Sequence, residues 1–108
     1  MSAFLFVCEA NELTENKSKR FTGEDFDIAL FNYKGEIFAV DNVCPHQHRA
    51  EIYQGEIENG CIVCPAHGWK FDLRTGKKTN GSKGLNTHEV KISGGKIFVK
   101  PTVKKFAW

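Results

Sequence analysis

The chain is 108 residues long; 41% of its residues are hydrophobic, 26% are charged, and its formal net charge at pH 7 is +2. This length and balance predict one soluble globular domain over residues 1–108, with a modest core that a bound cofactor would help to stabilise. No apolar run approaches the roughly 18 residues needed to cross a bilayer, and the first residues lack the basic region of a secretory signal. We therefore expect a cytoplasmic protein that does not associate with membranes.

The predicted elements of the first half are short strands. The apolar run at residues 3–8 has the length of a strand, and residues 11–19 form the only stretch with any helical character. Asp27–Tyr33 and Glu36–Asp41 follow, separated by Lys34-Gly35, and they predict a hairpin.

The second half continues in the same way. Gly60–Cys64 and Trp69–Leu73 are predicted as short strands, and a turn follows at residues 74–77. Glu89–Ser93 and Lys96–Lys100 flank two adjacent glycines, which are typical of a hairpin with a primed two-residue turn. Many short strands with little helix predict an all-β fold of sandwich or barrel type.

Charged side chains are distributed unevenly along the chain. Residues 1–63 carry 5 basic and 11 acidic side chains, whereas residues 64–108 carry 10 basic and 2 acidic ones. Two interpretations remain open: the charges cover the solvated faces of strands, or they form a surface that attracts a redox partner. Nucleic-acid binding is not expected, because the basic residues lack a compact block of interleaved aromatic side chains.

Two short segments predict the chemistry of this protein. Residues 44–46 read C-P-H and residues 64–67 read C-P-A-H, so the combined pattern is C-x-H-x17-C-x2-H. Each segment supplies one thiolate and one imidazole, which is the donor set of a [2Fe–2S] cluster with two Cys on one iron and two His on the other. A single tight turn cannot supply four ligands, so two loops must hold the cluster from opposite sides. The predicted ligands are Cys44, His46, Cys64 and His67.

The competing interpretation of these four side chains is a zinc site, because zinc takes the same atoms in a tetrahedron. Structural zinc sites usually pair C-x2–4-C with H-x3–5-H, and this spacing differs, so the iron–sulfur cluster is favoured. His48 lies near the first pair without standing at a ligand position. Cys8 and Cys61 are expected to be buried reduced thiols, and His88 is expected at the surface or half-buried in a strand.

With these residues, the chain resembles Rieske-type ferredoxins over nearly its whole length. The resemblance rests on K-G-E-I-F-A-V-D-N-V at residues 34–43, on G-C-I-V-C-P-A-H-G-W-K-F-D at 60–72, and on R-T-G at 74–76. The same segments are similar to the Rieske domains of ring-hydroxylating oxygenases and to small subunits of assimilatory nitrite reductase. The resemblance implies a basal antiparallel β sandwich carrying a smaller cluster-binding subdomain, here about residues 42–83.

The chain departs from the respiratory-chain members of that family. Those proteins add a Cys to each ligand loop and join the two by a disulfide, whereas the matching positions here are Arg49 and Ala66. They also place a Ser and a Tyr after the second ligand His, where hydroxyls donate hydrogen bonds to sulfur. Here those positions are Trp69 and Phe71, and Trp69 is expected to shield the cluster. The resemblance therefore implies a low reduction potential.

The expected function is that of a monomeric one-electron carrier, which accepts electrons from a reductase and passes them to an oxygenase or a similar acceptor. The chain is too short for a substrate site besides the cluster, and it lacks a 2-His-1-carboxylate set for mononuclear iron, so it is not expected to be an enzyme itself. Two alternatives remain open. The chain could be a non-catalytic subunit of a larger oxidoreductase such as nitrite reductase, or a redox sensor that binds a regulator.

Overall fold

The computed structural model describes residues 4–24, 26–43, 50–65, 68–78 and 84–102. Within them, one group of strands comprises β1 (Leu5–Glu9), β2 (Ser18–Thr22), β3 (Asp27–Tyr33), β4 (Glu36–Asp41), β8 (Thr87–Ser93) and β9 (Lys96–Lys100). A second group comprises β5 (Glu56–Glu58), β6 (Cys61–Val63) and β7 (Lys70–Asp72). Two short 3-10 helices, η1 (Ala10–Glu12) and η2 (Ile52–Gln54), complete the described elements.

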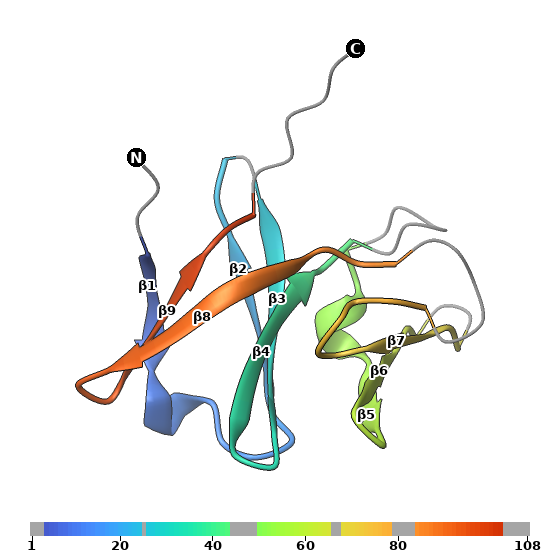
Figure 1. Cartoon of the computed structure of the whole chain (residues 1–108), viewed down its shortest axis with the longest axis horizontal. Coiled ribbons are helices and arrows are strands. Elements are labelled where there is room, and N and C mark those ends of the chain that lie inside the picture. Colours follow the sequence, from blue (N-terminus) through green and yellow to red (C-terminus); the bar gives the residue numbers. More distant parts are fainter. Residues whose placement is uncertain (1–3, 25, 44–49, 66–67, 79–83, 103–108) are drawn as a thin grey trace.

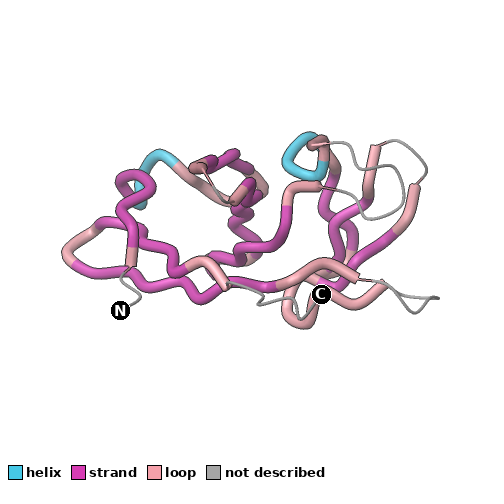
Figure 2. The backbone as a smooth tube through the Cα atoms, turned by 90° about the horizontal axis from the view of Figure 1, so that it is seen from above, coloured by secondary structure: helices cyan, strands magenta, loops and turns pink. Residues whose placement is uncertain are grey.

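The strands form two sheets, and all their pairings are antiparallel. The larger sheet has the order β1-β9-β8-β4-β3-β2, and the smaller one has the order β5-β6-β7. The smaller sheet lies to one side of the larger one, with η2 beside it (Figures 1 and 2). η1 directly follows β1 of the larger sheet. The all-β antiparallel fold expected from the sequence is thus confirmed.

The larger sheet folds over on itself between β4 and β8. The pairs that join these strands, Ala39 with His88 and Val40 with Thr87, lie at one end of each strand, so the two halves of the sheet can face each other. Apolar side chains fill the space between the halves, and we call them the basal core. The basal core consists of Cys8, Leu13, Ile28, Leu30, Ala39, Ile97 and Val99.

A second cluster of buried side chains joins the two sheets, and we call it the junction core. The junction core consists of Ala29, Phe31, Phe38, Val40, Ile52, Ile62, Cys64, Phe71, Leu73 and Leu85. Successive side chains of a strand point to opposite faces, so Ile28 and Leu30 enter the basal core while Ala29 and Phe31 enter the junction core. Burial on both faces explains why β3 is continuously apolar rather than alternating.

The structure also corrects the prediction of helix over residues 11–19. Only Ala10–Glu12 is helical, as a single 3-10 turn, and β2 already begins at Ser18. Asn16 adopts a left-handed conformation with φ of 65°, and its N–H donates to the carbonyl oxygen of Asn32 at 2.7 Å. The chain therefore leaves the helical conformation to pair with β3, a long-range contact that overrides the weak local preference.

Gly76 is expected to be a position where even a methyl group is destabilising. Its φ is +76°, its carbonyl oxygen accepts the Leu85 N–H at 2.6 Å, and a Cβ atom there would overlap the carbonyl oxygen of Leu85. Gly35 offers a matched control, because its φ is +85° but nothing lies within 4 Å of its Cβ position. In urea unfolding, we expect Gly35→Ala to cost about 1 kcal/mol through backbone strain alone, and Gly76→Ala about 3 kcal/mol or more. Equal losses of unfolding free energy in Gly35→Ala and Gly76→Ala would show that the close approach of Gly76 to Leu85 does not affect stability.

Candidate metal centre

The second ligand segment follows β6 directly and is closed by backbone hydrogen bonds. The N–H of Cys64 donates to the carbonyl oxygen of Trp69 at 2.8 Å, and the carbonyl oxygen of Cys64 accepts the N–H of Gly68 at 2.9 Å. Gly68 has a φ of 73°, which a residue with a side chain adopts only under strain. Cys64 and Gly68 are therefore joined by a backbone hydrogen bond, and the sequence places His67 between them.

The side chain of Cys64 belongs to the junction core. Cys64 is only 1% exposed, its thiol is not part of a disulfide, and Ile52 from η2 lies in the same core. A thiolate is costly in an apolar core unless a positive charge compensates it, and a bound ferric ion supplies such a charge. The burial of Cys64 therefore fits the role of a cluster ligand whose position is set by packing.

The other three predicted ligands, Cys44, His46 and His67, lie outside the described residues, as does His48. The structure does describe both ends of the first ligand segment, because Val43 pairs with Ala50 in an antiparallel bridge. In the described part of the chain, no group of three or more His, Cys, Asp or Glu side chains could hold a metal ion, and one predicted ligand alone falls in that part. The ligand assignment therefore remains a prediction.

Trp69 packs at the edge of the junction core. Its ring lies 6.4 Å from that of Phe71, measured between centroids, and Phe71 is fully buried. The ammonium nitrogen of Lys78 stands 3.3 Å from the centroid of the Trp69 ring. Lys78 follows the turn after β7 and is held beside the sheet by its bridge to Phe71. A positive charge and two aromatic rings without hydroxyl groups thus flank the second ligand segment.

The remaining Cys and the described His differ partly from expectation. Cys8 is buried and free, whereas Cys61 is free but only half-buried. Burial raises the pKa of the Cys61 thiol, and the neighbouring Asp72 adds to this. His88, expected at the surface or half-buried, is buried: its Nδ1 accepts the N–H of Thr102 at 2.8 Å, so its Nε2–H donates to Asp41 at 2.9 Å.

The uneven charge distribution of the sequence is partly balanced by ion pairs between the two halves of the chain. Basic residues of the second half form ion pairs with acidic residues of the first half: Lys70 with Glu58 at 2.8 Å, Arg74 with Glu36 at 2.8 Å, and Lys96 with Glu9 at 3.3 Å. The hydrogen bonds that Lys70 and Arg74 donate to Glu58 and Glu36 raise the pKa of both basic groups. These pairs are exposed and contribute little stability, and they support the interpretation of solvated strand faces.

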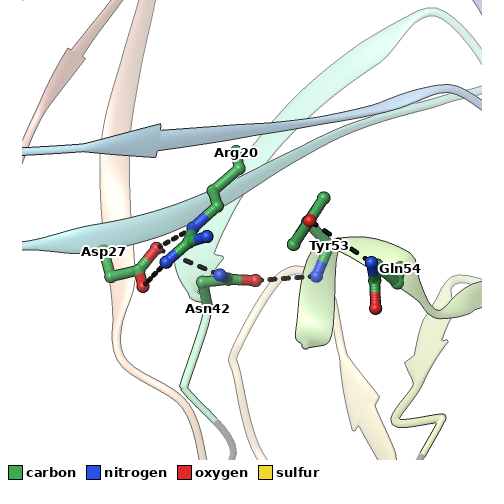
Figure 3. Close-up of polar contacts among 5 residues, drawn as sticks. All are labelled: Arg20, Asp27, Asn42, Tyr53 and Gln54. Carbon is green, nitrogen blue, oxygen red and sulfur yellow. Dashed lines mark hydrogen bonds and ion pairs between the residues drawn. The ribbon is translucent and has the colours of Figure 1, made fainter. Parts of the chain in front are cut away.

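Sequence reasoning missed one buried polar residue beside the first ligand segment, Asn42. It is fully buried, and Figure 3 shows its amide between Asp27 of β3 and the backbone of Tyr53 in η2. No signal in the sequence marks it, since Asn is mostly exposed and occupies a core position only where its amide is hydrogen-bonded. Its partners lie 15 and 11 residues away, and no local pattern indicates them.

Comparison with known protein families now identifies the class. The family described as the Rieske [2Fe-2S] domain matches residues 3–100, so the chain belongs to the Rieske family. It is 40% identical over 98 residues to the 3-phenylpropionate/cinnamic acid dioxygenase ferredoxin subunit of Photorhabdus laumondii subsp. laumondii, covering 88% of this chain and 91% of that protein. The chain is therefore an electron carrier that holds a [2Fe–2S] cluster, and it is not itself a catalytic enzyme.

Solved structures show the same fold. A chain from the complex of reduced oxygenase and oxidized ferredoxin in carbazole 1,9a-dioxygenase has a TM-score of 0.86 at 22% identity, with 98% of this chain and 100% of that chain covered. A small subunit assigned to an NADH-dependent nitrite reductase of Mycobacterium tuberculosis has a TM-score of 0.88 at 19% identity, with 96% and 99% covered. At these identities the likeness concerns the fold alone. Among the described residues, no helix is long and apolar enough to cross a membrane.

Proposed function

We propose that this protein carries single electrons from a reductase to the terminal oxygenase of a ring-hydroxylating dioxygenase system. The observation that carries the proposal is the 40% identity to a dioxygenase ferredoxin subunit over 88% of the chain. The chain would work as a monomer in the cytoplasm, and its cluster-binding subdomain would span about residues 42–83. Likeness to a nitrite reductase small subunit is confined to the fold, so that alternative has weaker support.

Cys44 and Cys64 would hold one iron of the cluster, and His46 and His67 the other, as the donor set of the two segments indicates. When bound, the cluster takes up and releases one electron without a proton being required. The chain's own residues provide the rest: the junction core excludes water from Cys64, and the backbone bonds of Cys64 with Gly68 and Trp69 keep the loop tight.

The purified protein is expected to be red-brown, with about two iron ions and two acid-labile sulfides per chain and no stoichiometric zinc. After reduction with dithionite, its EPR signal should have an average g value below that of a cluster held by four Cys, because imidazole ligands donate less electron density than thiolates. Metal analysis and EPR of one preparation check both expectations. A folded, stable protein with zinc alone would contradict the ligand chemistry.

The partner assignment is tested by replacing the ferredoxin in a reconstituted 3-phenylpropionate dioxygenase system. We expect the oxidised chain to be reduced by NADH with the reductase component, and the reduced chain to be reoxidised by the oxygenase component when aromatic substrate is present. The system's own ferredoxin is the positive control. A chain that is not reoxidised, yet elutes in a stable complex with a nitrite reductase catalytic subunit, would favour the alternative.

A further inference from the structure

The first ligand segment follows β4 of the larger sheet and leads into η2, and the residues at its two ends are joined by a bridge. Val43, which precedes the segment, pairs with Ala50, which follows it. Asn42 lies one residue before that bridge, and η2 begins two residues after it. Residues 44–49, which contain two of the predicted ligands, are thus joined at both ends to described structure.

Asn42 forms hydrogen bonds toward β3 and toward η2, through its backbone and through its side chain. Toward β3, its N–H donates to the carbonyl oxygen of Asp27 at 2.9 Å, and its Nδ2 donates to Asp27 Oδ1 at 3.0 Å. Toward η2, its carbonyl oxygen accepts the N–H of Ile52 at 3.1 Å, and its Oδ1 accepts the N–H of Tyr53 at 2.7 Å. β3 and η2 are therefore both bonded to one residue (Figure 3).

The orientation of the Asn42 amide is determined by its partners. A carboxylate can only accept and a backbone N–H can only donate, so Nδ2 must face Asp27 and Oδ1 must face Tyr53. An Asp at this position would place two carboxylates together. An Ala would remove the acceptor of the Tyr53 N–H and one of the donors to Asp27. Asn is the side chain that supplies both functions at this length.

The carboxylate of Asp27 in turn accepts hydrogen bonds from Arg20. Arg20 donates to it through Nε at 3.0 Å and through Nη2 at 2.8 Å. Burial acts to raise the pKa of Asp27, but the hydrogen bonds from Arg20 and Asn42 outweigh it and lower the pKa. The Arg20 guanidinium also lies 5.8 Å from the centroid of the Tyr53 ring, so it supports both partners of Asn42.

η2 also packs against the second ligand segment. Ile52, whose N–H is bound by Asn42, is fully buried in the junction core together with Cys64. Ser18 of β2 holds the other end of η2, because its hydroxyl donates to the carbonyl oxygen of Tyr53 at 2.6 Å. η2 is therefore fixed between the larger sheet and the core that contains the described ligand.

We propose that Asn42 is the positioning residue of the first ligand segment: by tying both ends of the segment to Asp27 and η2, it sets where Cys44 and His46 stand relative to Cys64. The inference rests on the proposed ligand assignment. The EPR g values of the cluster and its resistance to an iron chelator would then depend on Asn42, a side chain that is not itself a ligand.

The test compares Asn42→Ala with Asn32→Ala in the full-length protein. Asn32 is a matched control, because its amide also bonds on both sides, to Leu13 O at 2.9 Å and from Gly35 N–H at 3.0 Å, in a part of the larger sheet away from the ligand segments. For Asn42→Ala, we expect the half-time of bleaching by an iron chelator to fall about tenfold, with shifted EPR g values. Asn32→Ala should lower thermal stability but keep the wild-type half-time and g values. Wild-type behaviour of Asn42→Ala in both measurements would overturn the proposal.

A second pair of variants covers the case in which Asn42→Ala does not fold. Asp27→Ala removes the acceptor of the Asn42 amide together with the ion pair, whereas Arg20→Gln removes the ion pair and the contact of Arg20 with the Tyr53 ring but keeps that acceptor. We expect shifted g values for Asp27→Ala and wild-type g values for Arg20→Gln. Identical spectra for the two variants would overturn the proposal, because the effect would then not pass through Asn42.

The variant Cys44→Ser separates this inference from the ligand assignment. If Cys44→Ser loses the cluster while Asn42→Ala behaves like the wild type, the ligands are correct and the positioning role is wrong. If Cys44→Ser keeps a wild-type cluster, the ligand assignment fails, and the positioning proposal fails with it.

Discussion

The variant Cys64→Ser is expected to purify colourless, with no cluster, and the same result is expected for the other predicted ligands. The full set of variants is Cys44→Ser, His46→Ala, Cys64→Ser and His67→Ala. Each removes one of four bonds to iron, and a serine hydroxyl or a methyl group does not replace a thiolate or an imidazole. Iron and sulfide analysis with visible absorption measures the loss.

The chain provides its own controls for these variants. His48→Ala and Cys61→Ser remove the same side-chain types from positions outside the ligand pattern, and both are expected to keep the cluster. Strands of the larger sheet should survive in all the variants, because Cys64, the one predicted ligand that the structure describes, belongs to the junction core and not to the basal core. Hydrogen exchange should therefore show protection lost around η2 and β6 rather than across β3 and β4. Loss of the cluster in His48→Ala with retention in His46→Ala would show that the ligand assignment is wrong.

The reduction potential is expected to lie near the low end of the Rieske range of roughly −150 to +300 mV. Hydrogen bonds to sulfur stabilise the reduced, more negative state and raise the potential. Trp69 and Phe71 occupy the positions at which a Ser and a Tyr would donate such bonds, and neither carries a hydroxyl group. The double variant Trp69→Ser with Phe71→Tyr is therefore expected to raise the potential, as measured by protein-film voltammetry.

The structure adds a control to that experiment. Because Lys78 stands over the Trp69 ring at 3.3 Å, Trp69→Ser also releases a nearby positive charge. Lys78→Met removes this charge alone, and we expect it to lower the potential, since a cation favours the reduced state. A rise in the double variant together with a fall in Lys78→Met would assign the rise to the restored hydrogen bonds.

The potential should also be nearly flat around neutral pH and fall only in alkaline solution. A ligand imidazole loses its outer proton more easily when the iron is ferric, but an electron-rich cluster with few hydrogen bonds holds that proton to a higher pH. Voltammetry from about pH 6 to about pH 10 would show this. A potential in the upper half of the range with a steep fall already at pH 7 would contradict the low-potential assignment.

Features encoded over a few adjacent residues were predictable. The hairpin of β3 and β4 and the strand β9 have the predicted bounds, because a positive-φ turn between apolar runs is a local signal. β2 and β5 were missed, since S-K-R-F-T and E-I-E show little apolar alternation. β2 and β5 stand at the edges of their sheets and owe their conformation to pairing with β3 and β6.

The family and the cofactor could be recognised in the amino-acid sequence, because both depend on two segments in which ligand types and spacing can be read directly. Which polar residues are buried, and what they contact, depends on how the sheets pack. The sequence predicts His88 at the surface or half-buried and does not single out Asn42, yet both are buried, because Asp41, Asp27 and Tyr53 supply their hydrogen bonds. Likewise, Arg74 pairs with Glu36 across 38 positions. Such partners come together only when the sheets assemble, and no local sequence pattern indicates them.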